Sequence, residues 1–302
     1  MKIACVIQGD IRRGSDLVLR EMSKHFELTI LSTWEDEKSI PSGQFITIKS
    51  AKPAIAGFSS RNYQRKSTAR GIEMARHAGC DYILKWRTDM LATQLDVEQL
   101  LAWSDYQPPK DAKSRLVMPA FRNISINPDY LSTIPDLFAF GHIDEMERLW
   151  GEEGFDYSHQ YNVPPEFTKP LHELAQGDDL RDFYCAEAEL YAIYQSRVRN
   201  QLGLDLRHKV LAEKRLRLID YRKLGILWFG PKAGFRSIGQ AWEHPWWTET
   251  NWMKQNATVH SYGRPIGGIK GRIRRKISKM KIKAELKLQN QLWLKNYSAT
   301  VI

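Results

Sequence analysis

The chain has 302 residues, of which 42% are hydrophobic and 26% are charged. This is the composition of a soluble globular protein, and it excludes collagen-like and intrinsically disordered chains. The net charge of +10 is local, because residues 264–287 hold 10 Lys or Arg and one acidic residue, which leaves the rest nearly neutral. A local basic segment favours one contact with an anionic partner over a globally basic nucleic-acid-binding surface.

The N-terminus and the cysteines predict a cytoplasmic location. The apolar run from Ile3 to Ile7 is too short for a secretory signal, because Gln8 and Asp10 follow at once. No segment reaches the ~18 apolar residues that a membrane-spanning helix requires. The three cysteines are far apart, so they predict neither a disulfide framework nor a metal site.

The first half of the chain alternates between short apolar runs and segments with helical spacing. Strands are expected over 3–7, 27–32, 45–48, 81–86 and 116–119. Helices are expected where apolar residues recur at steps of three and four. These segments are 15–26, 62–77, 143–150 and 183–202. Short buried strands that alternate with helices predict an α/β domain, with a mostly parallel sheet flanked by helices.

A polar cluster follows the strand expected over 81–86. Ligands of open α/β sheets bind outside the carboxyl ends of the strands. Lys85 and Arg87 can bond phosphate oxygens there, and Asp89 can ligate a divalent cation. The alternative is an Asp that caps the next turn beside two solvated cations.

A second polar cluster opens the helix expected over 62–77. Ser60 or Asn62 would cap this helix, and the free amides of its first turn would face the mouth of the sheet. The alternative is a capped surface helix with basic side chains on its outer face.

Five short motifs stand in a characteristic order. They are Val6-Ile7-Gln8-Gly9, Ile30-Leu31-Ser32-Thr33-Trp34-Glu35, Asn62-x-Gln64-x-x-Ser67-Thr68-x-x-Gly71, Leu84-Lys85-x-Arg87-Thr88-Asp89 and Asp136-Leu137-Phe138-x-Phe140-Gly141. In this order, over roughly residues 3–195, the chain resembles the WavE lipopolysaccharide-synthesis family. The resemblance implies a GT-A-like glycosyltransferase, whose Rossmann-type N-terminal half binds a nucleotide sugar. Asp10 departs from the family's usual Pro, and Tyr63 from its Arg.

The resemblance also implies a donor site. Its donor-binding residues would be Gln8, Gly9, Asn62, Gln64, Lys85 and Arg87. Asp89 would bind the donor ribose and a metal ion. The need for a divalent cation, Mn²⁺ or Mg²⁺, stays open, because only Thr88 separates Arg87 from Asp89 and there is no two-Asp motif. Trp34 either stacks on the nucleotide base or packs the turn after its strand.

A reaction that inverts the anomeric centre needs a carboxylate base for the acceptor hydroxyl. Glu187 is the first candidate, followed by Glu189 and Asp136. The alternative is that Glu187 and Glu189 are ordinary charges on a helix surface. A retaining reaction needs no such base, and the sequence does not decide between the two outcomes.

The C-terminal part is predicted to be an accessory region. The catalytic domain is expected over 1–205, and residues 206–302 form a Trp-rich and basic helical extension. Over 264–292, apolar residues recur at steps of three and four among Lys and Arg, which predicts a basic amphipathic helix. Such a helix can bind an anionic membrane surface. The alternatives are a helix packed on the protein and, less favoured, RNA binding.

These observations predict a glycosyltransferase that moves a sugar from a nucleotide-sugar donor to a lipid-linked or oligosaccharide acceptor. The acceptor would belong to lipopolysaccharide, O-antigen or capsule synthesis at the inner membrane face, with no nucleic acid as partner. The alternative is a non-catalytic GT-A-like scaffold that binds polysaccharide machinery or anionic lipid. A nucleotidyltransferase or phosphotransferase is a weaker third reading, and the lack of a Walker-type glycine loop argues against a kinase.

Overall fold

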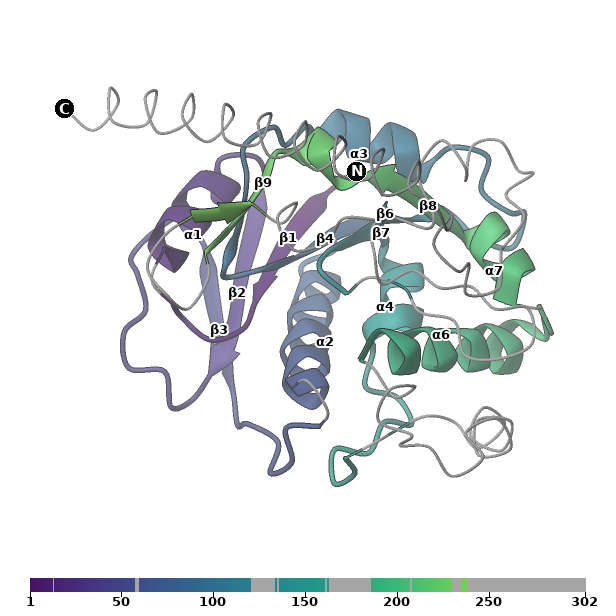
Figure 1. The fold of residues 1–302 in the computed structure, drawn as a ribbon, viewed down its shortest axis with the longest axis horizontal. Helices are drawn as coiled ribbons and strands as arrows, with labels where there is room; N and C mark the ends of the chain where they lie inside the picture. Colours follow the sequence, from purple (N-terminus) through teal and green to yellow (C-terminus); the bar gives the residue numbers. More distant parts are fainter. Residues whose placement is uncertain are drawn as a thin grey trace, which may run out of the picture.

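The fold is an α/β sandwich with a central sheet between two layers of helices (Figure 1). The structure is a computed structural model, and it describes residues 1–12, 14–57, 60–120, 134, 136–160, 162, 186–206, 208–229 and 235–237. The helix predicted over 264–292 and the Trp-rich stretch from Trp242 to Trp252 lie outside the described residues. Within the described ranges, no helix is both long and apolar enough to cross a lipid bilayer.

Within the described part of the chain, seven strands form the central sheet in the order β3-β2-β1-β4-β7-β6-β8. These are β1 (Ile3–Gln8), β2 (Leu28–Trp34), β3 (Ile46–Ser50), β4 (Tyr82–Arg87), β6 (Leu116–Ala120), β7 (Ala139–His142) and β8 (Leu216–Asp220). Neighbouring strands pair in parallel, except that β7 runs antiparallel to β4 and β6. The prediction of a mostly parallel sheet is confirmed. The sheet also continues past residue 205, where the α/β domain was expected to end, because β8 belongs to it.

A second, smaller sheet lies beside the first and was not expected. It has the order β10-β9-β5, with β5 (Met90–Ala92), β9 (Ile226–Phe229) and β10 (Phe235–Ser237), and its strands pair antiparallel. Because two residues separate β4 from β5, the chain passes from the large sheet to the small one through Thr88 and Asp89.

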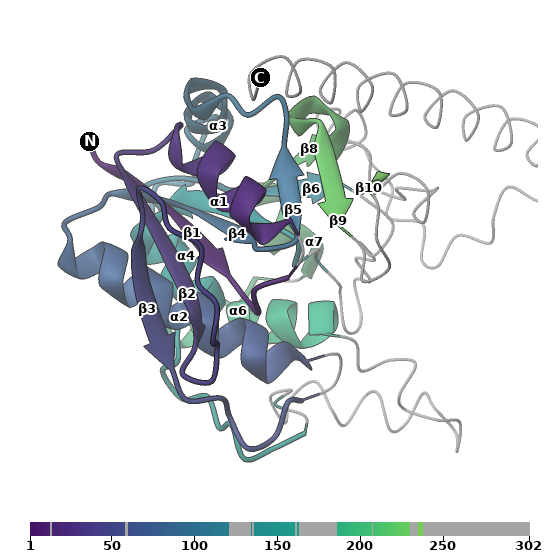
Figure 2. The same cartoon turned by 90° about the vertical axis from the view of Figure 1, so that its left-hand side faces the viewer.

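The helices cover the two faces of the central sheet (Figures 1 and 2). They are α1 (Ser15–Ser23), α2 (Arg61–His77), α3 (Val97–Ser104), α4 (Ile143–Trp150), α6 (Ala186–Leu202), α7 (His208–Arg215) and the 3-10 helix η3 (Tyr221–Leu224). On one face lie α2, α4 and α6, and on the other lie α1 and α3. The helix predicted over 143–150 is confirmed at both ends, whereas α3 and α7 were not predicted.

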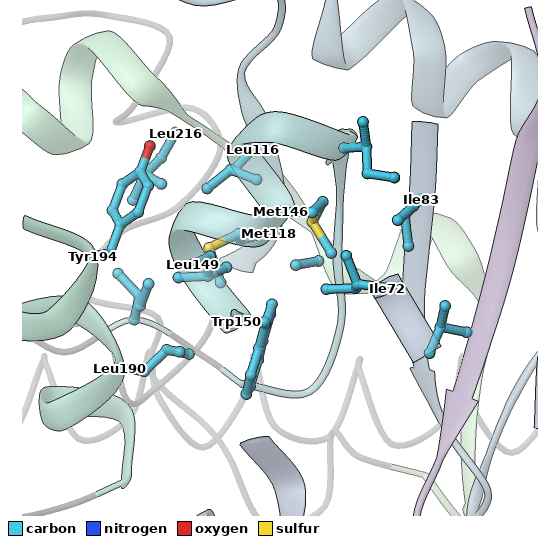
Figure 3. Packing of buried hydrophobic residues seen from close by; sticks show 14 of the residues in the cluster. Ile72, Ile83, Leu116, Met118, Met146, Leu149, Trp150, Leu190, Tyr194 and Leu216 are labelled. Carbon is cyan, nitrogen blue, oxygen red and sulfur yellow. The ribbon is translucent and has the colours of Figure 1, made fainter. Parts of the chain in front are cut away.

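Two hydrophobic cores separate the sheet from its helices. Successive side chains of a strand point to opposite faces, and both faces here are covered. On β4, Ile83 therefore joins the core under α2, α4 and α6, and Leu84 and Trp86 join the core under α1 and α3. Figure 3 shows the first core, in which Trp150 and Tyr194 are buried among aliphatic side chains.

A buried network of charges links the helices of the first face to the start of β8. The carboxylate of Glu145 on α4 accepts hydrogen bonds from Arg215 at 2.9 Å, from the Tyr194 hydroxyl at 2.8 Å and from Arg148. Only 1% of Glu145 and 1% of Arg215 is exposed. Burial lowers the pKa of Arg215 to about 10 and raises the pKa of Glu145, although Arg148 and Tyr194 pull the latter down. This network anchors β8 within the same body as the preceding strands.

Gly71 sets the distance between α2 and the sheet. A Cβ atom at this position would overlap the Cγ1 atom of Val6 on β1. The helix therefore packs against β1 more closely than any other residue would permit. The glycine of the Ser67-Thr68-x-x-Gly71 motif thus has a packing role.

We expect Gly71→Ala to lower the free energy of unfolding by about 1–2 kcal/mol. The overlap with Val6 costs about 1–3 kcal/mol, and the better helix propensity of Ala returns less than 1 kcal/mol of it. Urea unfolding followed by circular dichroism measures the change. In the Gly71→Ala background, Val6→Ala should cost less than it does alone, because the smaller side chain removes the overlap. Strictly additive effects would contradict this account of the helix–sheet contact.

Candidate functional site

The two polar clusters expected at strand ends lie together. In the parallel register of β1 on β4, Gln8 stands opposite Arg87. Beyond the strands, the Thr88 amide donates to the Gln8 carbonyl at 3.2 Å, and the Thr88 hydroxyl donates to the Asp10 carbonyl at 2.7 Å. Gln8 and Asp89 therefore occupy the same carboxyl edge of two adjacent central strands, as predicted.

Gly9 makes the turn that leads out of β1. Its φ of +120° is one that side-chain-bearing residues rarely adopt, and an added Cβ would lie 3.3 Å from the Thr88 hydroxyl oxygen. The turn is held from β2, because the Gly9 amide donates to the Ser32 carbonyl at 3.1 Å and the Thr33 hydroxyl donates to the Gly9 carbonyl at 3.0 Å. Glycine is thus required by the turn itself, whatever binds there.

Asp89 is held by two arginines. Arg87 donates to it through Nε at 2.8 Å and Nη2 at 2.9 Å, which is the two-pronged geometry of strong guanidinium–carboxylate pairs. Arg12, in the loop after β1, donates to the Oδ2 atom through Nη1 at 3.0 Å. The exposed side-chain fractions are 2% for Asp89, 24% for Arg87 and 46% for Arg12. The carboxylate therefore lies behind two cations that face solvent.

The charges of the neighbouring carboxylates act on Arg87. Burial alone would lower its pKa, but the charge and hydrogen bonds of Asp89, with smaller contributions from Asp136 and Glu187, raise it well above the ordinary value. Arg87 is therefore a permanent cation. Asp136 and Glu187, two of the predicted catalytic carboxylates, lie near enough to this edge of the sheet to interact with it.

Lys85 does not reach the surface of this site. Its side chain is fully buried, and its amine donates to the carbonyls of Asp136 and Leu137, the latter at 3.4 Å. It also lies over the Trp150 ring, 4.6 Å from the ring centroid. Burial lowers the pKa of Lys85 to about 7, although the charge of Asp136 raises it. In the described structure, Lys85 holds the backbone that leads into β7, and its predicted donor contact stays a prediction.

Gln64, Asn62 and Gln8 are also engaged within the protein. The Gln64 amide donates to the Asp136 carbonyl at 3.1 Å, and the Gln8 side-chain oxygen accepts from the Ser67 hydroxyl at 2.7 Å. The buried Asn62 amide donates to the carbonyls of Ile55 at 2.9 Å and His159 at 3.0 Å. Asn62 thus ties the segment before α2 to the segment after α4.

The cap expected at the start of α2 is absent. Ser60 adopts a left-handed conformation with φ of 60° and makes no side-chain capping hydrogen bond. The Asn62 amide group is directed to other carbonyls, and its backbone N–H donates to Ala56 at 3.0 Å. The prediction that Ser60 or Asn62 caps the helix is therefore wrong, because Asn62 lies inside the helix and the preceding turn supplies a backbone acceptor to its N–H.

Trp34 and Glu189 make contacts within the protein that explain their positions. Only 1% of Trp34 is exposed, and its ring packs edge-to-face on Tyr63 with 5.5 Å between centroids, so packing of the turn explains it. Glu189 is paired with Arg61 at 2.9 Å and accepts the Asn162 amide at 2.6 Å. Burial raises the pKa of Glu189, whereas the Arg61 charge lowers it. Glu189 thus fastens α6 to α2, while Glu187 is half-buried near Arg87.

Sequence reasoning missed Arg12. Arg12 lies in a loop with no periodic pattern, three residues beyond Gly9. Asp89 is 77 residues away in the sequence, and only the fold brings the two side chains into contact. Its proximity to the first glycine of the strand-end turn was the one signal that could have pointed to it. Thr88 was part of a motif, but the sequence did not predict its hydrogen bonds to Gln8 and Asp10.

The residues around Asp89 do not fit a divalent cation, the need for which the sequence left open. Asp89 could bind a divalent cation only through its carboxylate oxygens, and both of them already accept hydrogen bonds from Arg87 and Arg12. Across the part of the chain that the structure describes, no three His, Cys, Asp or Glu side chains are grouped as a metal site would require. A metal at Asp89 would have to displace two guanidinium groups.

Two cavities lie away from this edge of the sheet. One of about 470 Å³ is lined by mixed charges of α2, α4 and α6, among them Arg70, Glu147 and Arg197. Another of about 350 Å³ lies beside α7 and is lined by Lys110 and Lys214. Neither contains the residues that the motifs place at the strand ends.

Comparisons of the whole chain with protein-family models and with curated proteins find no match. The function must therefore be argued from the residues and their geometry.

We expect Lys85→Met to flatten the pH dependence of stability above neutral pH. Between pH 7 and about 10.5, the unfolded chain holds a proton on Lys85 that the folded chain lacks, so folded-state stability rises with pH in this window. The slope from one proton is at most about 1.4 kcal/mol per pH unit. Urea unfolding of both proteins from pH 7 to 10 measures it. Parallel curves for the wild type and the variant would show that Lys85 is charged throughout.

Proposed function

We propose that the chain is a GT-A-like glycosyltransferase that uses a nucleotide-sugar donor. One observation carries the proposal: Gly9, Arg12, Arg87 and Asp89 meet at the carboxyl edge of β1 and β4, the two central parallel strands. This edge is where open α/β sheets bind their ligands. The five ordered motifs that resemble the WavE family supply three of these four residues.

The arrangement of the two sheets supports the GT-A-like assignment. Asp89 lies at the step from β4, in the large sheet, to β5, in the small one. Junctions between substructures are common places for ligand sites. A mostly parallel sheet with one antiparallel strand, β7, is compatible with the Rossmann-type half that the motifs imply.

The chemistry follows from the charges at this edge. In the proposed transfer, an acceptor hydroxyl oxygen bonds to the anomeric carbon, the bond from that carbon to the donor phosphate breaks, and the nucleotide leaves with an added negative charge. Arg87 and Arg12 would stabilise that charge as it develops. In an inverting reaction, Glu187 or Asp136 would accept the hydroxyl proton, since both carboxylates act electrostatically on Arg87.

The acceptor in this proposal is a lipid-linked or oligosaccharide intermediate of lipopolysaccharide, O-antigen or capsule synthesis. It rests on the motif resemblance and on the basic segment 264–292, which would bring the enzyme to the anionic inner face of the membrane. That segment lies outside the described residues, and its support is the spacing of its apolar and cationic side chains.

We expect Asp89→Asn to lower turnover at least about a hundredfold, the usual loss for one group that stabilises transition-state charge. The reason is that Asn cannot hold both guanidinium groups. Release of nucleotide from a panel of UDP-, GDP-, CMP- and dTDP-sugars measures turnover, and circular dichroism checks the fold. Asp81→Asn, at the opposite end of β4 and half-exposed, is the matched control and should stay active.

Should Asp89→Asn unfold, Arg87→Lys tests the same site, because it keeps the charge but loses the two-pronged contact. Near-normal turnover in a folded Asp89→Asn or Arg87→Lys protein would contradict the assignment. Absence of turnover in the wild type with every donor, with and without Mn²⁺, would favour the non-catalytic scaffold.

A further inference from the structure

We infer that Arg12 and Arg87, oriented by Asp89, form a clamp that binds the diphosphate of the nucleotide without a metal ion. These three side chains are called the arginine clamp below. The inference rests on the proposed function and deepens it. It assigns a binding role to Arg12, which no motif contains, and it makes Asp89 a positioning residue.

The order of exposure across the arginine clamp shows which charge meets a ligand. Asp89 is 2% exposed, Arg87 24% and Arg12 46%. Within the clamp, a ligand that arrives from solvent therefore meets the guanidinium groups first and the Asp89 carboxylate last. Beside the clamp, the Asp10 carboxylate is as exposed as Arg12, with which it pairs at 3.7 Å. This order suits an anion, whereas a site for a cation would present its carboxylate oxygens to the ion.

The hydrogen bonds leave donors on the outer side of the clamp. A guanidinium carries five N–H groups in a fixed fork. Arg87 uses Nε and Nη2 on Asp89, and among the described residues its Nη1 group makes no hydrogen bond. Arg12 uses Nη1 on Asp89, and its Nη2 atom lies 3.7 Å from Asp10, beyond hydrogen-bond distance. Asp89 thus fixes the planes of both guanidinium groups while donors remain for phosphate oxygens.

The charges of the clamp itself favour a diphosphate over a divalent cation. Two arginines and one carboxylate leave the clamp with a net charge of +1. An incoming diphosphate is attracted to this charge, whereas a divalent cation would be repelled and would have to displace two guanidinium groups from Asp89. Beside the clamp, Asp10 lies 3.7 Å from the Nη2 atom of Arg12 and 3.7 Å from the Lys52 amine, and Lys52 pairs more closely with Asp36 at 2.9 Å. The Asp10 carboxylate therefore offsets part of the positive charge on Arg12.

The backbone that carries Arg12 is held in place. The Arg12 amide donates to the Ser15 hydroxyl at 2.8 Å, and the Ile11 amide donates to Glu37 at 3.0 Å. Hydrogen bonds thus hold the chain at Ile11 and at Arg12 itself, in the described part of the loop. A cation on a fixed loop loses little conformational freedom when it binds an anion.

The test is calorimetric titration of the full chain with UDP, GDP, CDP, ADP and dTDP, once with EDTA and once with Mn²⁺. The wild type should bind at least one of these in EDTA, with the same affinity as in Mn²⁺. Arg12→Gln should weaken that diphosphate at least about tenfold in EDTA, as for loss of a charge-assisted hydrogen bond. Arg20→Gln, an exposed arginine of α1 that pairs with Glu21, is the matched control and should bind normally.

Nucleoside monophosphates separate a positioning role from general damage. Asp89→Asn should weaken the diphosphate more than the monophosphate of the same nucleoside, because only the clamp is disordered. Equal weakening of both would mean that Asp89 merely supports the fold, and this would overturn its positioning role.

The outcomes distinguish the clamp from the proposed function. Binding in Mn²⁺ that EDTA abolishes would overturn the metal-independent clamp and leave the glycosyltransferase proposal standing. Unchanged binding by Arg12→Gln would also overturn the clamp. Failure of all five diphosphates to bind in either buffer would overturn the clamp, and the glycosyltransferase proposal would then depend on turnover of a CMP-sugar, which releases a monophosphate.

Discussion

The parallel register of β1 on β4 is the constraint on which the site depends. It sets Gln8 beside Arg87, so the two strands end together and their loops meet through Thr88 and Asp10. The positive φ of Gly9 then turns the chain toward α1. On the helical side, Gly71 allows α2 to lie close to β1. Two glycines thus define the geometry of this edge: Gly9 allows the turn beside Thr88, and Gly71 allows the close contact between α2 and β1.

Within that edge, a buried carboxylate behind two cations determines which ligands are favourable. Asp89 stabilises Arg87 as a permanent cation and directs it toward solvent together with Arg12. The same contacts occupy the oxygens that a metal would need. Other polar side chains of the motifs point inward: Lys85 and Asn62 hold the backbone around the site through carbonyl oxygens. The motifs therefore combine a small ligand-facing group with a larger supporting group.

The sequence predicts the main layers because β1 and β4 are short, continuous apolar runs that are buried on both faces, and because α4 has apolar residues at helical spacing. It does not predict β5 or β9, since three- and four-residue strands exist only through pairing between segments more than 130 residues apart. For the site, strand-end logic places Gln8 and Asp89 correctly. It cannot reveal that the Lys85 side chain is buried, because the packing of strands and loops decides this. It also cannot reveal that Arg12 contacts Asp89, because Arg12 lies in a loop without a periodic pattern.

The central claim is that a nucleotide binds at the carboxyl edge of β1 and β4 with its phosphates on arginine. A crystal structure of the chain with the nucleoside diphosphate bound, grown in EDTA, tests this most directly. The account predicts phosphate oxygens within about 3 Å of the guanidinium nitrogens of Arg12 and Arg87. A nucleotide seated instead in the groove between α2, α4 and α6, or phosphates held at Asp89 by a metal ion, would contradict it.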